Sequence, residues 1–264
     1  MTSPPSTPGT TDWAAERYQT LAARLQPISE ALCATAGLRA GERVLDVACA
    51  TGNAALAAAR RGCEVTAVDL DPGMLAVARR RSAAEHLPVE ARAGDAQCLP
   101  FPDRSFDAVL STYGAMFARD AGATARELAR VCRPGGRIAL ANWSPGGAID
   151  EVFAVLHRHR AGSPDLTRAV AAWGTAEKVR ALFPAARVDT ADRHFDLRST
   201  SCRAWSETFL RSFGPAAPDP ADTSGTATVL RAGLLRAFGN HTSPDGPGVR
   251  IRHAYLEAVI TPLQ

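Results

Sequence analysis

Several features are scarce in this sequence of 264 residues, and each scarcity argues against a class of protein. The six cysteines, at positions 33, 49, 63, 98, 132 and 202, form no C-x-x-C pair and show no metal-site spacing. No basic-then-apolar leader opens the chain, and no apolar run is long enough to span a membrane. Because several cysteines fall in apolar stretches, we expect reduced thiols and a soluble, cytoplasmic protein that does not contact membranes.

Charge of one sign is also scarce. The chain has 30 basic and 27 acidic residues, a net charge of +3, and its only tight basic cluster is Arg79–Arg81. A cluster of this kind is typical of the solvated end of a helix, and the balance is too mild to indicate a nucleic-acid partner.

What is present is enough apolar sequence, 46%, for one sizeable core. We expect a disordered tail at residues 1–11 and a single domain over 12–264. Its parts are N-terminal helices (12–40), a central core (41–145), a substrate-side cap with late elements (146–248) and a final strand (249–264).

Strands and helices alternate through the central core. Apolar runs predict strands at 44–47, 65–69, 89–93, 105–111 and 137–141, the last after a turn at 134–136. Helical spacing predicts one or two helices in 12–37 and single helices at 54–60, 72–85 and 121–132. This alternation indicates an α/β fold with a parallel, doubly wound sheet.

The pattern loosens in the second half. It predicts helices at 149–160, 175–183, 204–213 and 226–238 and strands at 186–195 and 249–260, with Thr175 as a helix N-cap. Loops are expected at 214–225 and 241–248.

A turn of very small residues follows the first strand. Residues 48–53 read Ala-Cys-Ala-Thr-Gly-Asn and lead directly into a helix. Such a turn lets a ligand press against the backbone and meet the amides at the helix N-terminus, where an anion is favoured. Taken alone, this is a nucleotide-binding fingerprint of the Rossmann kind.

Two carboxylates follow the next strands. Asp69 ends the second strand, where it can accept hydrogen bonds from both hydroxyls of a ribose, and Asp95 ends the third, where it can accept from an exocyclic amine such as that of adenine. The carboxyl ends of parallel strands share one edge, so we expect the turn, Asp69 and Asp95 to converge. Four residues could flank the ring: Leu70, Met74, Ala96 and Gln97.

Four motifs in this order and spacing resemble the class I S-adenosylmethionine-dependent methyltransferases. They are DVACATGN, AVDLDPGML, GDAQCLPFPDRSFDAV and RVCRPGGRIALANW, and they look most like the ubiquinone/menaquinone-biosynthesis type and its bacterial small-molecule relatives. The resemblance covers residues 13–144 well. It implies a Rossmann-like sheet of seven strands whose last strand, at residues 251–260, is antiparallel.

The resemblance also implies site residues and a cofactor, S-adenosyl-L-methionine, which becomes S-adenosyl-L-homocysteine. Asp46 and the turn through Ala48, Ala50, Gly52 and Asn53 would hold the methionine moiety. Asp69 would hold the ribose, Asp95 and Ala96 the adenine edge, and Ser111 the region beside the sulfonium. Tyr18 could close over the cofactor, although a packing role suits it equally.

One departure from the family concerns two alanines. The family usually has glycine at the positions of Ala48 and Ala50. Ala48 is expected to narrow the space, whereas a positive φ at Ala50 would cost about 1–3 kcal/mol. Either the backbone avoids that conformation or cofactor affinity is reduced. A nicotinamide dehydrogenase is disfavoured because the third glycine of the dinucleotide fingerprint is absent and Leu56 lies nearby.

In methyl transfer, the enzyme mainly has to align the acceptor atom with the methyl group of the cofactor, and it depends less on reactive side chains. Tyr113, Met116, Asn142 and Trp143 follow the fourth and fifth strands, where an acceptor would sit. Tyr113, His194 and His241 are candidate catalytic residues, the two histidines as bases, while packing suits Tyr113 and Trp143 as well as substrate contact does. His157 and His159 are two apart on a predicted helix, so they cannot share a metal. No acidic pair follows the fourth strand, and we expect no metal.

We therefore predict a methyltransferase of bacterial secondary metabolism that acts on a nitrogen, oxygen or carbon atom of a small molecule, as a monomer or homodimer. One alternative is a protein of the same fold that keeps the pocket but catalyses a non-methylating reaction or serves as a subunit. Another is an RNA methyltransferase, which would call for a basic face with stacking aromatics.

Overall fold

The computed structural model describes residues 15–159, 165–213 and 224–263. The expected tail at 1–11 and most of the expected loop at 214–225 lie outside this part of the chain. Of its helices, none is long and apolar enough to cross a membrane.

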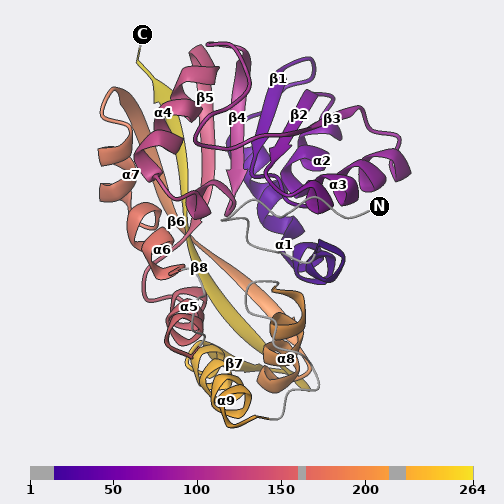
Figure 1. The fold of residues 1–264 in the computed structure, drawn as a ribbon, viewed down its shortest axis with the longest axis vertical. Coiled ribbons are helices and arrows are strands. Elements are labelled where there is room, and N and C mark those ends of the chain that lie inside the picture. Colours follow the sequence, from indigo (N-terminus) through magenta and orange to yellow (C-terminus); the bar gives the residue numbers. More distant parts are fainter. Residues whose placement is uncertain (1–14, 160–164, 214–223, 264) are drawn as a thin grey trace, which may run out of the picture.

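The described residues form one mixed sheet with helices around it (Figure 1). Its strands are β1 (Arg43–Val47), β2 (Glu64–Asp69), β3 (Val89–Ala93), β4 (Phe106–Thr112), β5 (Cys132–Trp143), β6 (Ala186–Ser199), β7 (Thr242–Asp245) and β8 (Gly248–Pro262). Its helices are α1 (Ala15–Thr35), α2 (Asn53–Ala59), α3 (Pro72–Ala84), α4 (Ala121–Val131), α5 (Ala148–His159), α6 (Thr167–Trp173), α7 (Ala176–Leu182), α8 (Cys202–Ser212) and α9 (Gly225–Gly239), with a 3₁₀ turn, η1 (Ala115–Phe117).

The strand order, β3-β2-β1-β4-β5-β8-β6, confirms the doubly wound sheet. Strands β1 to β5 pair in parallel, and β8 runs antiparallel to both β5 and β6. The chain moves outward from β1 to β3 and then returns to place β4 on the other side of β1. Ligands bind at such a switch point, outside the carboxyl ends of the strands.

Local chemistry explains where the helices begin. The Asp71 carboxylate accepts the amides of Gly73 and Met74, and Pro72 follows at the first helical position, where its missing donor costs nothing. The expected N-cap of α7 is confirmed, because the Thr175 hydroxyl accepts the amide of Lys178. From residue 15 onward, where the structure describes the chain, one helix and not two precedes β1, and it continues through Pro27.

Three expectations were wrong in detail. Residues 241–248 are not a loop: β7 pairs with β8 around a tight turn in which Gly246 has a φ of 58°. This adds an eighth strand to the expected seven. Residues 134–136 lie within β5 as an irregularity of its pairing with β4, not as a turn before it. Helix α6 was not predicted, because its seven residues are too few to show a helical repeat.

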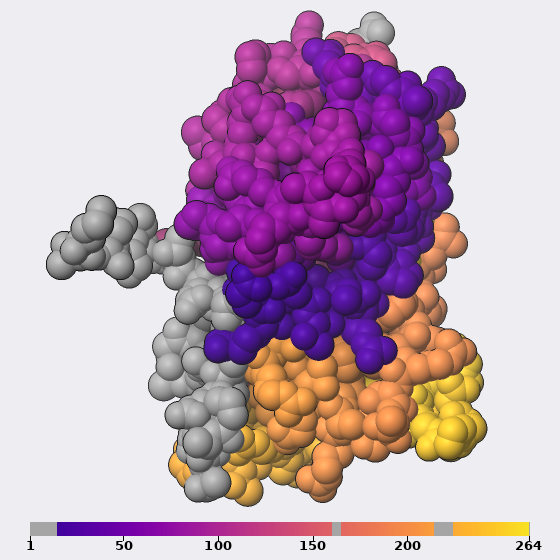
Figure 2. All heavy atoms as spheres, turned by 90° about the vertical axis from the view of Figure 1, so that its right-hand side faces the viewer, coloured from indigo at the N-terminus to yellow at the C-terminus, as the bar shows by residue number. Residues whose placement is uncertain are grey.

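The second half of the chain builds a cap below the sheet. In Figure 1, β6 and β8 run past the other strands into the lower part of the molecule, where α5, α8, α9 and β7 gather. Figure 2 shows α1, in indigo, as a band between the purple core half and the orange segment that contains α8. Helix α1 packs on α2 and on α8, so it lies between the sheet edge and the cap.

Candidate functional site

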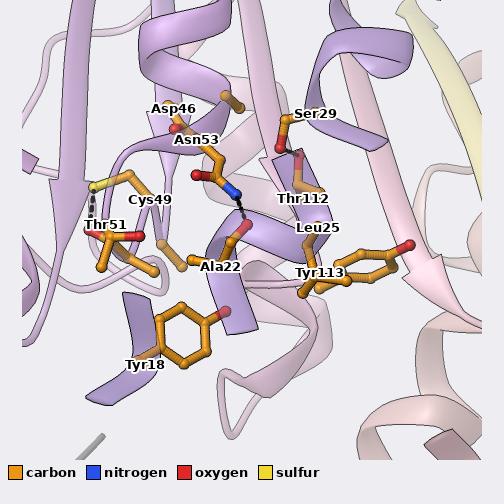
Figure 3. Close-up of a pocket in the computed structure, with 13 residues that line it drawn as sticks. Tyr18, Ala22, Leu25, Ser29, Asp46, Cys49, Thr51, Asn53, Thr112 and Tyr113 are labelled. Carbon is orange, nitrogen blue, oxygen red and sulfur yellow. Dashed lines mark hydrogen bonds between the residues drawn. The ribbon is translucent and has the colours of Figure 1, made fainter. Parts of the chain in front are cut away.

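A pocket opens at the carboxyl ends of β1 and β4, as the topology predicts (Figure 3). Its cavity volume is about 30 Å³, well below the several hundred Å³ typical of small-ligand sites, so bound ligand would require its lining to open. Its lining comes from α1, from the turn after β1 and from the end of β4: Tyr18, Ala22, Leu25, Ser29, Asp46, Ala48, Cys49, Ala50, Thr51, Asn53, Ala54, Thr112 and Tyr113. The sequence had indicated six of these for the cofactor or catalysis: Tyr18, Asp46, Ala48, Ala50, Asn53 and Tyr113.

The turn after β1 holds its two alanines in a left-handed conformation. The φ angles are 54° at Ala48 and 47° at Ala50, followed by 85° at Gly52. The expectation for Ala48 was therefore wrong, since this residue also bears the backbone cost that was anticipated only for Ala50. The strain persists because neighbouring groups determine the path of the turn.

Gly114 is one of those neighbours. A Cβ atom built on Gly114 would lie 2.2 Å from the carbonyl oxygen of Ala48, so no larger residue fits between the end of β4 and the turn. Residue 113, immediately before it, also has a positive φ, 63° at Tyr113. The turn after β1 and the segment after β4, both with positive φ angles, are thus in close contact beside the pocket.

The carboxylates of Asp46 and Asp69 hold this backbone. Asp46 accepts the Ala55 amide at 2.8 Å and so caps the first turn of α2. Asp69 accepts the Ala50 amide at 2.8 Å and the Asp71 amide at 2.9 Å. An ionised carboxylate has about four acceptor positions, so each group keeps capacity for a ligand donor.

Burial changes the acidity of these groups. Loss of solvation raises the pKa of Asp46 to about 7, and it also raises the pKa of Asp69. Burial, with a smaller effect from the charge of Asp69, raises the pKa of Tyr18 to about 12. Tyr18 is therefore a neutral phenol at physiological pH, and Asp46 changes charge near neutrality.

Helix α1 is fastened over the turn by a polar network. The Asn53 side chain donates to the Ala22 carbonyl at 2.7 Å, as Figure 3 shows, and Gln26 donates to the Asn53 carbonyl. Arg81 on α3 donates to the Thr51 carbonyl at 2.7 Å and to the Asn53 side chain at 2.8 Å. The sequence reasoning missed Arg81. It also missed Ala22, Leu25 and Ser29, although their spacing from Tyr18 places all four on one helix face.

The residues expected around an adenine follow β2 and β3. Asp69, the last residue of β2, is paired with Ala93, the last residue of β3. Asp95 follows two residues later, so it lies near the end of β2. The Asp95 carboxylate accepts the backbone and side-chain amides of Gln97. Leu70 is 54% exposed, whereas Met74, in the first turn of α3, is buried. Ala96 is buried beside Asp95.

Ser111 is engaged within the protein. Its hydroxyl donates to the Val47 carbonyl at 2.8 Å and accepts the Ala115 amide at 2.9 Å. These bonds join the ends of β1 and β4 and leave one acceptor position free. A sulfonium contact by Ser111 stays a prediction.

The two histidines proposed as bases do not line the pocket. His194 is exposed on β6. His241 follows α9 in the cap, where Nε2 lies 2.9 Å from a carboxylate oxygen of Glu151 on α5. Within the described ranges, no cluster of three or more His, Cys, Asp or Glu could hold a metal ion.

Tyr113 and Trp143 lie face to face beside the pocket. Their ring centroids are 3.7 Å apart with 2° between the planes, and the Tyr255 ring meets Tyr113 edge-on at 6.0 Å. Burial raises the pKa of Tyr113 well above its ordinary value, and the nearby Tyr255 and Glu257 add to this. Tyr113 therefore serves poorly as a base and well as a hydrogen-bond donor.

Comparison with known proteins agrees with this geometry. A family model described as a methyltransferase domain matches residues 45–140. An uncharacterized protein of Mycobacterium tuberculosis is 36% identical over 229 residues, which are 85% of this chain and 83% of that protein. The demethylmenaquinone methyltransferase of Mycobacterium sp. strain KMS is 38% identical over 53% of this chain and 58% of its own length.

A solved structure supports the fold. The YcgJ protein of Bacillus subtilis superposes with a TM-score of 0.66 at 22% identity, covering 89% of this chain and 98% of that one. The strand order, the turn after β1, the carboxylates that follow the strands and the relatives all indicate a methyltransferase. The chain belongs to the class I S-adenosylmethionine-dependent methyltransferases.

Proposed function

We propose that this enzyme transfers the methyl group of S-adenosyl-L-methionine to a nitrogen, oxygen or carbon atom of a small organic molecule, leaving S-adenosyl-L-homocysteine. The observation that carries the proposal is the pocket at the β1/β4 switch point, where a strained turn of small residues meets the buried carboxylate of Asp46 and is held by the half-buried carboxylate of Asp69. A role in bacterial secondary metabolism stays a prediction.

The residues of the pocket, with those at the neighbouring ends of β2 and β3, fit this cofactor. Asp46 would hold the ammonium group, with the methionine moiety lying along Ala48 to Asn53. Asp69 has acceptor positions left for the ribose hydroxyls, and Asp95 with Ala96 would meet the adenine edge. Because Gly114 has no Cβ, it leaves room for the turn at Ala48. An alanine at position 114 would clash with the Ala48 carbonyl oxygen.

When bound, the cofactor supplies an electrophilic methyl group on a sulfonium. The chain then has to orient the acceptor and exclude water, and well-aligned reactants gain effective molarities of roughly 10⁵–10⁸ M. Tyr18 and Leu25 of helix α1 line one side of the pocket, and Tyr113, directly after β4, lines another.

A small acceptor is favoured over RNA by the charges. Arg60, Arg61, Arg130 and Arg137 each form ion pairs with carboxylates of the chain. Paired guanidinium groups have little charge left for phosphates, whose neutralisation dominates nucleic-acid affinity. A salt-dependent RNA affinity would be evidence for the other class.

The test is intact-mass analysis of a metabolite panel incubated with the protein and S-adenosylmethionine. We expect one class of small molecule to gain a single methyl group. If the cofactor binds but no compound gains a methyl, the same-fold protein with a non-methylating reaction or a subunit role becomes the better account.

A further inference from the structure

The basic cluster Arg79–Arg81 contains one residue for which the sequence interpretation was wrong. Arg79 and Arg80 are exposed, as expected at the solvated end of a helix, whereas Arg81 is half-buried. Loss of solvation lowers the pKa of Arg81, and this residue forms no ion pair with a carboxylate of the described residues. A charged group that is withdrawn from water is costly unless hydrogen bonds satisfy it. Arg81 makes these bonds to uncharged oxygen atoms beside the pocket.

The hydrogen bonds of Arg81 join three elements around the pocket. From α3, its Nη1 donates to the Thr51 carbonyl at 2.7 Å and to Oδ1 of Asn53 at 2.8 Å. Its Nη2 donates to Oε1 of Gln26 on α1 at 3.3 Å. Hydrogen bonds from a charged donor are stronger than those between neutral groups. The guanidinium group therefore connects α3 to the turn after β1 and to α1.

Asn53 and Gln26 add two further bonds between α1 and the turn. The Asn53 side chain donates to the Ala22 carbonyl at 2.7 Å, as Figure 3 shows, and the Gln26 side chain donates to the Asn53 carbonyl at 3.3 Å. Ala22 itself lines the pocket. The three side chains of Arg81, Asn53 and Gln26 thus hold the pocket-lining face of α1 against the turn.

Helix α1 is weakened directly after these contacts. Pro27 lies inside the helix and has no N–H to donate to the carbonyl group four residues earlier. Beyond it, Ile28 and Leu32 are 3% and 0% exposed, so the second part of α1 is fixed in the core. Pro27 is therefore the point at which residues 15–26 would pivot.

The size of the cavity requires that one wall of the pocket moves. A cavity of about 30 Å³ is far too small for the cofactor. The turn after β1 is a fixed wall, because the Asp69 carboxylate holds the Ala50 amide and Gly114 packs against Ala48. Helix α1, in contrast, is tied to the turn by side-chain hydrogen bonds and is weakened at Pro27. Helix α1 is therefore the wall that opens.

We propose that the hydrogen bonds of Arg81, Asn53 and Gln26 form an autoinhibitory contact, which holds residues 15–26 of α1 closed over the empty cofactor site. The cofactor binds when these bonds open and the helix pivots at Pro27. This rests on the proposed function and adds a regulation of the same site. A protein whose binding-competent state is a minor population binds its ligand more weakly in proportion to that population. Weakening the contact therefore speeds cofactor binding and raises the affinity, whereas loss of a merely structural contact lowers the affinity.

The test measures the binding rates of S-adenosylhomocysteine by surface plasmon resonance. Gln26→Leu removes the bonds that cross from α1 to Arg81 and to the Asn53 carbonyl, and it leaves Arg81 bonded to the turn. Its association rate constant should rise roughly threefold to tenfold with an unchanged dissociation rate constant, so the affinity should rise by the same factor. Gln19→Leu is the matched control, because the Gln19 side chain donates to Glu16 of the same helix. This control should keep the rates of wild type.

Hydrogen exchange in the cofactor-free protein gives a second readout. In Gln26→Leu the amides of residues 15–26 should exchange faster than in wild type, because the closed helix has lost two of its ties. The amides of residues 28–35, beyond Pro27, should exchange as they do in wild type.

Equal or slower association of S-adenosylhomocysteine with Gln26→Leu would overturn the proposal, and so would unchanged exchange of residues 15–26. If neither wild type nor Gln26→Leu binds S-adenosylhomocysteine, the proposed function is contradicted instead, and the exchange measurement still tests the closed helix. If Gln26→Leu does not fold, Arg81→Met, which removes the donors on α3, takes its place with the same expected rise in association rate.

Discussion

Asp46 is the residue whose protonation should control cofactor affinity. Burial places its pKa at about 7, and a cofactor ammonium group would favour the ionised carboxylate. Binding then releases a proton below pH 7, so affinity rises with pH through that value. From pH 6 to pH 8 we expect S-adenosylhomocysteine to bind about tenfold more tightly, given tenfold per pH unit below the pKa.

Calorimetry at the two pH values checks this expectation. Asp46→Asn keeps an acceptor for the Ala55 amide but cannot ionise, so its affinity should be lower and flat between pH 6 and pH 8. If the variant keeps the full pH dependence of wild type, another group is responsible.

Some site residues could be predicted from the sequence and others could not. Asp69 was placed correctly at the end of β2, and Asp95 just beyond β3, because the strand-type residues of the sequence stop there. The backbone strain at Ala48 was not predicted, since it follows from the Asp69 bond to Ala50 and from Gly114 pressing on the turn.

At the scale of elements, the turn after β1 and the end of β4 behave as one unit. Gly114→Ala would place a methyl group 2.2 Å from the Ala48 carbonyl oxygen, so one of the two segments must move. We expect S-adenosylhomocysteine affinity to fall at least tenfold, with destabilisation of about 1–3 kcal/mol from overpacking.

Urea unfolding and calorimetry measure the two effects. Gly225→Ala is the control, because nothing lies within 4 Å of its added Cβ. This control should match wild type in both measurements. Normal binding by Gly114→Ala would mean that the turn does not depend on its contact with β4.

Elements with strong local signals were predicted well. The strand at 89–93 was found with its full bounds, and α3 and α7 have the Pro and Thr start signals of their sequences. Elements that depend on tertiary pairing were not. Strand β7 contains Pro244 and exists because β8 pairs with it, and α6 is a short helix held by contacts with α5, α7 and η1.

At the scale of the molecule, His253 joins the sheet to the cap. Its ring on β8 lies 6.3 Å from Trp205 of α8 and 6.1 Å from Phe238 of α9. Burial lowers its pKa from 6.5 to about 4. Between these values the unfolded chain binds the proton and the folded chain does not, so this residue's contribution to stability is complete above pH 6.5 and is lost as the pH falls toward 4.

His253→Phe should remove that dependence while it keeps a ring in the same place. Between pH 7 and pH 5, wild type should lose about 2 kcal/mol more unfolding free energy than the variant, at 1.36 kcal/mol per pH unit. Urea unfolding at each pH measures it. Asp46 titrates with the opposite sign but equally in both proteins, so it cancels. Parallel curves for the two proteins would show that His253 is charged in the folded state.

The most direct test of the whole account is calorimetric titration of S-adenosylhomocysteine into wild-type protein and Asp69→Ala, with Asp189→Ala, an exposed carboxylate on β6, as the control. We predict binding by wild type and the control, and an affinity about 10–150-fold lower for Asp69→Ala, as expected for loss of hydrogen bonds to a charged group of about 1.5–3 kcal/mol. Wild-type affinity in a folded Asp69→Ala protein, or no binding by wild type, would contradict it.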